Sequence, residues 1–197
     1  MPTPPDFTAG TALAAASLNA VGLWRITPTG ISGTGASLSG AKITLTTCTA
    51  AKISGVFSAD YENYLLVGRA ITTTGDIYAQ FMVGTTETTT NYNYAMMQAY
   101  AGAGVTAVRT AGTTALTMFA MGAGTTTYCS STVDIFAPQL ATATLWQCTN
   151  NRSDNSYGLP ANYLWHGNQS DNTQFDGLRL FSAGNITGTF YIYGRRG

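Results

Sequence analysis

After residue 24 the chain consists of short runs of strand length, separated by Gly, Asn, Asp or Thr-Thr at intervals of about 8 to 15 residues. The runs are rich in Thr, Val, Ile, Tyr and Phe, which suit a pleated, half-buried surface. Residues 41–47 alternate with a period of two and place Ile43 and Leu45 on one face. No helical pattern follows residue 24, and a parallel α/β sheet would require crossover helices. The sequence therefore predicts an all-β protein, either an antiparallel jelly-roll-like β-sandwich or a barrel.

Two of the predicted strands, residues 63–72 and 76–83, are joined by Thr73-Thr74-Gly75, which predicts a compact hairpin. No fixed internal period is present, which argues against a solenoid or a propeller. The remaining predicted strands cover residues 41–47, 92–100, 115–121, 128–136, 143–149, 161–165, 175–181 and 187–195.

A short helix is expected before the strands, over residues 11–22. Thr11 is a suitable N-cap, Gly22 stands where a glycine commonly ends a helix, and the apolar residues between them recur with a period near 3.6. A helix of this length is marginal by itself, so we expect it to dock against a neighbour. This divides the sequence into an N-terminal docking segment, residues 1–24, and one β-sandwich domain, residues 25–197. The expected docking positions are Leu13, Leu18, Val21 and Trp24.

Charged residues make up only 9% of the 197 residues, where about 25% is usual. Nine basic and nine acidic residues cancel, and no basic cluster is present, so electrostatic binding to nucleic acid or to an anionic membrane is not expected. The apolar stretch at residues 12–24 is too short to cross a bilayer, which needs about 20 residues. Because uncharged surfaces do not repel one another, the composition favours self-association into a closed oligomer.

Three cysteines, Cys48, Cys129 and Cys148, form an odd set without C-x-x-C spacing. The pattern favours neither metal ligation nor a disulfide framework, and it predicts buried free thiols that act as small apolar residues. The start of the chain also lacks the positive region of a secretory signal. We therefore expect synthesis and initial folding in a reducing cytoplasm.

The sequence contains no recognisable catalytic motif, and we expect no catalytic, cofactor-binding or metal-binding residues. Its single histidine, His166, has no evident nucleophile to pair with, because the sequence contains no G-x-S-x-G elbow or other protease-like motif. Carboxylate pairs such as Asp60 with Glu62 are the alternative, since a glycosidase needs two carboxylates, but Asp60 and Asp171 lie in turn-like sequences where Asp bonds its own backbone. The glycines also lack the spacing of a phosphate loop.

The most polar segment, residues 150–176, is the candidate binding region. Planar side chains beside Asn and Asp are typical of a sugar-binding surface, which suggests contact with a receptor or host glycan. Tyr163 and Trp165 lie two apart on one strand face, where a core position is the favoured alternative. The candidate contact residues are Tyr157, His166, Asn168 and Asp171.

Three segments resemble tail and fibre proteins of double-stranded DNA bacteriophages. Residues 6–24 contain the pattern F-x-x-G-x-x-L-x-A-x-x-x-N, which in those proteins precedes a β domain. Residues 175–197 are similar to their last hairpin, which ends in I-x-G-x-x-x-(V/I)-Y-G. Residues 56–67 resemble their F-S-A-x-Y-x-N-Y turn. Residues 85–149 match nothing in this group.

The resemblance implies a virion structural protein with a β-sandwich, commonly trimeric, and with no catalytic residues. We expect a minor tail or tail-fibre component at the surface of the phage particle, contributing to host attachment, with partners that are other copies of itself, other virion proteins and a host surface glycan. A capsid decoration or head-fibre protein is the alternative within the virion. A glycan-degrading tailspike enzyme and a cellular lectin-like module are the alternatives of other classes.

Overall fold

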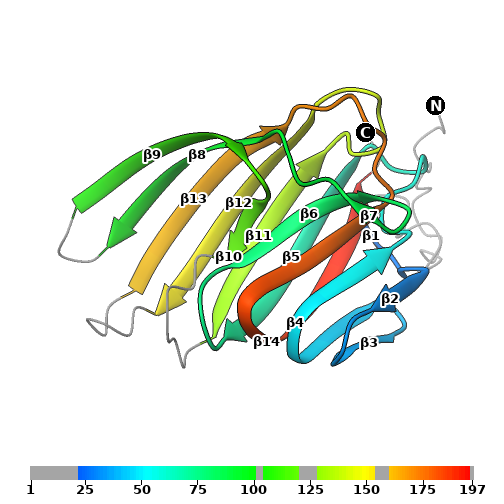
Figure 1. The fold of residues 1–197 in the computed structure, drawn as a ribbon, viewed down its shortest axis with the longest axis horizontal. Coiled ribbons are helices and arrows are strands. Elements are labelled where there is room, and N and C mark those ends of the chain that lie inside the picture. Colours follow the sequence, from blue (N-terminus) through cyan, green and yellow to red (C-terminus); the bar gives the residue numbers. More distant parts are fainter. Residues whose placement is uncertain (1–21, 101–103, 120–127, 154–159, 196–197) are drawn as a thin grey trace, which may run out of the picture.

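The computed structural model describes residues 22–100, 104–119, 128–153 and 160–195, and in these ranges every element is a β-strand (Figure 1). All the strand pairs in the sheet are antiparallel, which confirms the predicted all-β class. The expected helix at residues 11–22, with Leu13, Leu18 and Val21, lies outside the described residues. Within the described ranges no helix is long and apolar enough to cross a membrane. The strands are β1 (Leu23–Arg25), β2 (Gly30–Ser32), β3 (Ala36–Ser39), β4 (Lys42–Ser54), β5 (Asn63–Thr72), β6 (Ile77–Val83), β7 (Thr86–Glu87), β8 (Tyr92–Tyr100), β9 (Gly104–Thr113), β10 (Leu116–Phe119), β11 (Cys129–Phe136), β12 (Thr144–Ser153), β13 (Pro160–Gln169) and β14 (Gly177–Arg195).

The main path through the sheet runs β10-β6-β14-β5-β11-β12-β13-β8-β9. β4 and β1 also pair with β14, β2 and β3 pair with β4, and β7 pairs with β6. β1 and β9 therefore lie at opposite ends of the sheet (Figure 1). β9 pairs with β8 and with no other described strand, so it forms one free edge.

The long strand β14 bends, and this bend folds one part of the sheet over the other. Its first half pairs with β6 and its second half with β5, while β4 follows it along the other side in both halves. β5 and β6 form one continuous path beside β14, because Thr72 lies opposite Ile186 and Ile77 lies opposite Ser182. The result is a sandwich-like arrangement of a larger layer (β1, the second half of β14, β5, β11, β12, β13, β8 and β9) and a smaller layer (β10, β6, β7, the first half of β14, the second half of β4 and β2) (Figure 1).

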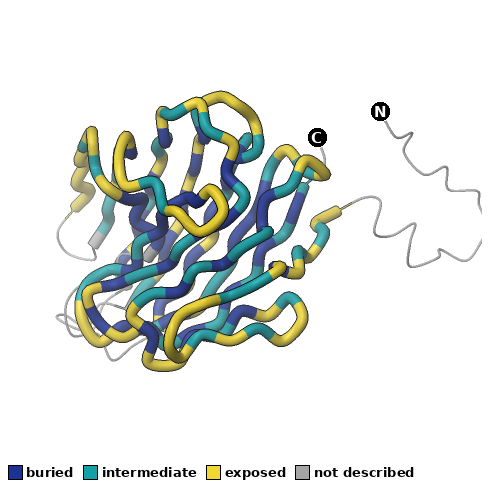
Figure 2. Tube along the Cα trace, turned by 45° about the vertical axis from the view of Figure 1, so that its right-hand side comes forward, coloured by how far each residue is buried: buried dark blue, intermediate teal, exposed yellow. Residues whose placement is uncertain are grey.

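Apolar side chains from both layers meet in one buried cluster. Phe81 of the smaller layer stacks on Tyr92 of the larger layer, with ring centroids 6.1 Å apart, and on Phe175, at 5.1 Å. Buried residues alternate with exposed or half-buried ones along β11, β12 and β14, as expected for strands with one face in a core (Figure 2). The outer face of the larger layer, which points away from the smaller layer, is consequently open to solvent.

Two of the sequence predictions about strand connections are wrong. Residues 63–72 and 76–83 form no hairpin with each other, because they lie end to end along the same side of β14 and each pairs with β14 instead. Residues 175–181 and 187–195 are not separate strands of a last hairpin, because Gly177–Arg195 is continuous. At Gly184 the backbone of β14 passes close to residues 73 and 74, since a Cβ there would lie 2.6 Å from Oγ1 of Thr73 and 2.9 Å from the carbonyl oxygen of Thr74.

Candidate functional site

A groove of about 340 Å³ lies on the outer face of the larger layer, where β13, β8 and β9 run side by side. Strand register builds it: His166 of β13 lies opposite Ala95 of β8, and Ala95 lies opposite Arg109 of β9. Two residues further along, Asn168 of β13 lies opposite Asn93 of β8. These five residues define what we call the β8 groove.

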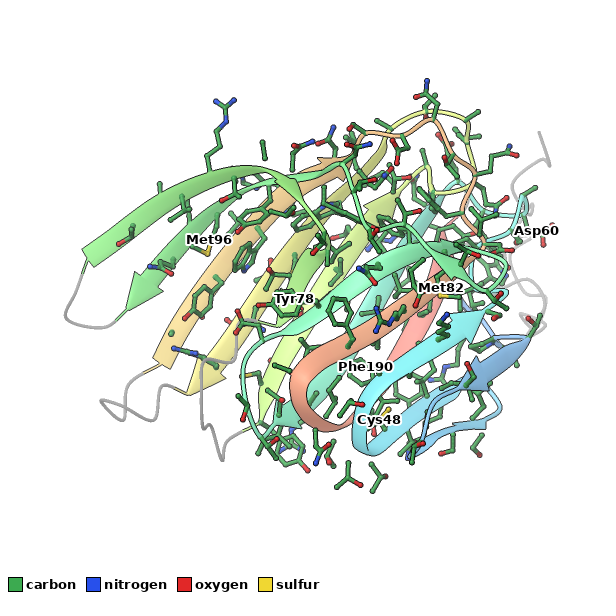
Figure 3. All side chains as sticks on the ribbon, viewed as in Figure 1. Cys48, Asp60, Tyr78, Met82, Met96 and Phe190 are labelled. Carbon is green, nitrogen blue, oxygen red and sulfur yellow. The ribbon has the colours of Figure 1, made fainter. Side chains whose placement is uncertain are left out.

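The small side chain of Ala95 leaves a depression between its two cross-strand neighbours. His166 and Arg109, one on each side of Ala95, are both exposed and much longer, so they form the walls while Ala95 forms part of the floor. Met96, the next residue of β8, points to the other face and packs against the core (Figure 3). The core thus holds β8 in place while its outer face carries the groove.

A hydrogen-bond chain fixes the orientation of the two asparagine amides. The backbone N–H of Gly112 donates to Oδ1 of Asn93 at 3.0 Å, and an N–H can only donate. Nδ2 of Asn93 therefore donates to Oδ1 of Asn168, at 3.1 Å. Because the oxygen of Asn168 is the acceptor in this bond, its NH₂ group is the end left to face a ligand.

Gly167, between the two groove residues of β13, permits the close approach of β8. A Cβ at this position would clash with the carbonyl oxygen of Asn93 and would lie 2.7 Å from Cζ2 of the buried Trp146. Any other residue would push β8 and β13 apart or displace the indole ring. The groove therefore depends on a glycine at this point of the strand.

Of the four predicted contact residues, His166 and Asn168 lie in the β8 groove. Asp171 does not line it: its two carboxylate oxygens accept hydrogen bonds from Nδ2 of Asn91, at 2.6 Å, and from Nε2 of Gln169. Tyr157 lies outside the described residues. Tyr163 and Trp165 are buried and stack with ring centroids 6.4 Å apart, which confirms the core alternative for this pair.

Asn93 and Arg109 belong to the groove but were not among the residues singled out from the sequence. Each lies more than 50 positions before His166, and only the pairing of β13 with β8 and of β8 with β9 brings them together. The sequence signal for Asn93 was its alternation with Tyr92 and Tyr94 along a predicted strand. Arg109 carried no such signal, because β9 was not predicted.

The residues considered for catalysis have structural roles or lie apart. Oδ2 of Asp60 accepts a hydrogen bond from Oγ of Ser58, and Asp171 is held by Asn91 and Gln169. The three cysteines are free and buried, as predicted. Burial raises the pKa of Cys148 to about 12, so its thiol stays protonated at neutral pH. Across the described residues no group of three or more His, Cys, Asp or Glu side chains is placed to hold a metal ion.

One described residue from each of the three segments that resemble phage tail proteins lies at one end of the larger layer, while residues 6–21 of the first segment lie outside the described residues. Trp24 lies opposite Gly194 in the β1–β14 pair, and the ring of Tyr61 lies 5.9 Å from the ring of Trp24. Tyr61 also covers Gly194, where a Cβ would lie 2.6 Å from its ring carbons. The hydroxyl of Tyr64 closes the turn by accepting from the N–H of Ser58 and donating to its carbonyl oxygen, both at 2.7 Å. We call the contact of Trp24, Tyr61 and Gly194 the base cluster.

A scan against protein-family models finds no family that matches this chain, and a search of curated proteins finds no match either.

Proposed function

We propose that this chain is a structural protein of a bacteriophage virion, a minor tail or tail-fibre component with a jelly-roll-type β-sandwich that contributes to host attachment. The base cluster is the observation that carries the proposal. Tyr61 and Gly194 belong to two of the resembling patterns and Trp24 ends the segment that holds the third, and these three residues, far apart in sequence, contact one another. The packing of these residues into one unit supports the proposal that the segments belong to one family pattern.

The position of the β8 groove supports a role in attachment. The chain enters the described domain at β1, beside the base cluster, whereas the groove lies on β13, β8 and β9 toward the opposite end of the sheet (Figure 1). In the proposal, residues 1–24 anchor the protein to the virion, with Leu13, Leu18, Val21 and Trp24 at the contact. The β8 groove then faces away from the particle, toward the host.

The free edge at β9 supports self-association, and we propose a homotrimer. Both faces of β9 are open to solvent, with Val105 69% exposed and Val108 40% exposed, and Met97 on the adjacent β8 is 48% exposed. An edge strand without Lys or Pro offers the backbone groups of its open side to another chain. Light scattering of the purified protein tests this, and a monomer at micromolar concentration would overturn the trimer.

Purified virus particles test the proposed location. Quantitative mass spectrometry is expected to find the chain at a copy number typical of a tail tip or fibre, and antibody labelling is expected to mark the tail. Labelling of the head at the copy number of capsomers would favour the capsid decoration alternative. Absence of the chain from purified particles would overturn the proposal.

Competition and turnover assays test the proposed role. Excess purified protein is expected to slow adsorption of the particles to host cells, because it occupies the same surface receptors. Incubation with host polysaccharide is expected to release no reducing ends. Release of reducing ends would instead support the tailspike enzyme.

A further inference from the structure

We infer that the β8 groove binds an acidic saccharide, through a carboxylate or phosphate group held by Arg109. The inference rests on the proposed role in host attachment and names the class of ligand. It starts from the polar groups that line the groove. Arg109 carries five N–H donors and His166 at least one, and Asn168 presents its NH₂ group because its oxygen is bonded to Asn93.

The groove is positively charged although the chain as a whole is neutral. None of the described residues that line it is acidic, and Arg109 makes no ion pair with any described residue. The carboxylate of Asp171 keeps its charge, because its hydrogen-bond donors Asn91 and Gln169 are neutral amides, but Asp171 does not line the groove. Asp134, in the same cross-strand row as His166, is paired with Arg195 at 2.7 Å. A ligand therefore meets an unneutralised guanidinium, whose planar fork of donors matches a carboxylate or a phosphate.

The same face lacks what a neutral sugar would need. Neutral sugars usually gain affinity by stacking on an exposed aromatic ring, but the aromatic residues of β13 point the other way. Tyr163 and Trp165 are buried, and the ring of Tyr94 packs edge-on against Trp165 with centroids 5.1 Å apart. Among the described lining residues His166 offers an imidazole, but no exposed Tyr, Trp or Phe ring is present to stack on a sugar, so charge-assisted hydrogen bonds are the strongest contacts that the groove offers.

The size and shape of the groove fit one or two sugar units of a longer chain. Its volume of about 340 Å³ is at the lower end of the range for small-molecule sites, about 300 to 1,000 Å³. It is open to solvent, so a polymer can continue beyond the units bound. The donors stand at the walls, and Ala95 leaves the floor flat for the face of a sugar ring.

Calorimetry with defined probes tests the inference. The probes are trigalacturonic acid, the neutral trisaccharide of galactose, and N-acetylglucosamine 1-phosphate. We expect one or both acidic probes to bind, and the neutral probe to bind at least about tenfold more weakly. Arg109→Gln is expected to weaken acidic binding by about tenfold or more, because it removes a hydrogen bond to a charged group. Arg69→Gln is the matched control: Arg69 is also exposed on a strand of the larger layer, but it lies over Tyr128, outside the groove.

Each other outcome overturns the inference. Equal binding of the neutral probe would contradict the preference for negative charge. Equal loss of binding in the two arginine variants would show that Arg109 does not mark the binding site. Failure of both acidic probes to bind would exclude acidic saccharides as the ligand. The adsorption assay separates this from the proposed function. If the purified protein still blocks adsorption while the acidic probes fail, the attachment role stands and only the ligand inference is wrong.

Discussion

The ring of Tyr61 lies directly on Gly194, two carbons of the ring being 2.6 Å from where a Cβ of residue 194 would stand. Trp24, the cross-strand partner of Gly194, contacts the same ring. The turn near residue 60 thereby packs against the last strand, because the Tyr61 ring fills the space that a side chain at Gly194 would occupy. The base cluster is therefore a single packing unit, because a change in the size of either residue must displace the other.

Gly194→Ala is expected to destabilise the protein by about 1–3 kcal/mol, because the new methyl group overpacks the site and displaces the Tyr61 ring. In a Tyr61→Ala background the same change is expected to cost at least about 0.5 kcal/mol less, since the obstructing ring is gone. Urea unfolding of the four proteins of this cycle measures both values.

Gly30→Ala is the control for this cycle, because no atom lies within 4 Å of a Cβ at residue 30. Its effect is expected to stay within about 0.5 kcal/mol. An equal cost of Gly194→Ala with and without Tyr61 would contradict the proposed contact.

Gly167→Ala is expected to lower stability and to abolish ligand binding in the β8 groove together. The added methyl group meets the carbonyl oxygen of Asn93 and the ring of Trp146, so β8 moves and the Asn93–Asn168 hydrogen bond is lost. We expect a loss of about 1–3 kcal/mol, measured by urea unfolding. Asn168→Ala separates the two effects: it should weaken binding with little change in stability. A fully stable Gly167→Ala protein would show that β8 and β13 have room for a methyl group between Asn93 and Trp146.

The strands that were predicted well are those bounded by turn residues and half-buried. Residues 63–72 and 92–100 were predicted with the bounds that β5 and β8 have in the structure. β9 was missed because it is exposed on both faces, and its Gly, Ala and Thr residues show no alternation of apolar and polar side chains. β14 was divided in two because Gly184 and Asn185 resemble a turn, whereas the glycine there permits the crossing beside Thr74.

The β8 groove shows why the site was only half predictable. His166 and Asn168 are two residues apart, so their common face follows from the strand period alone. Arg109 reaches the same face through two strand pairings, and pairing partners are set by the tertiary structure. The aromatic residues of the same segment were predicted as either core or sugar contacts. The register resolves the choice for Trp165, which lies opposite Cys148 and Met96 on the inner face.

The cluster of Lys52, Glu87 and Arg179 predicts a loss of stability in acid. Lys52 donates to the carboxylate of Glu87 at 3.0 Å, and this hydrogen bond, together with the charge of Arg179, holds the pKa of Glu87 below its ordinary value of 4.5. A lowered pKa in the folded state means that the folded protein binds fewer protons than the unfolded chain. The contribution is therefore complete above about pH 4.5 and is lost as the pH falls through the folded pKa.

Urea unfolding between pH 7 and pH 3 checks this. Glu87→Gln is expected to be less stable than the unmodified protein at pH 7, by under about 1 kcal/mol, because the cluster is partly exposed. The gap is expected to close as the pH falls below 4.5. Glu62→Gln is the control, since Glu62 is exposed and makes no ion pair with a described residue. A gap between the Glu87 variant and the unmodified protein that is constant with pH would contradict the assignment.

The buried cysteines are expected to resist thiol reagents until the protein unfolds. Burial raises the pKa of Cys129 to about 11 and of Cys148 to about 12, and it also raises that of Cys48. Because the thiolate is the reactive form, the native protein at pH 8 is expected to react with a disulfide reagent such as DTNB far more slowly than a small free thiol does. In guanidinium chloride all three thiols should react at once. If one thiol reacts quickly in the native state, selective Cys→Ala variants will show which strand opens. Fast reaction of Cys148 would mean that β10, whose Met118 carbonyl accepts from this thiol at 3.1 Å, separates readily from β12.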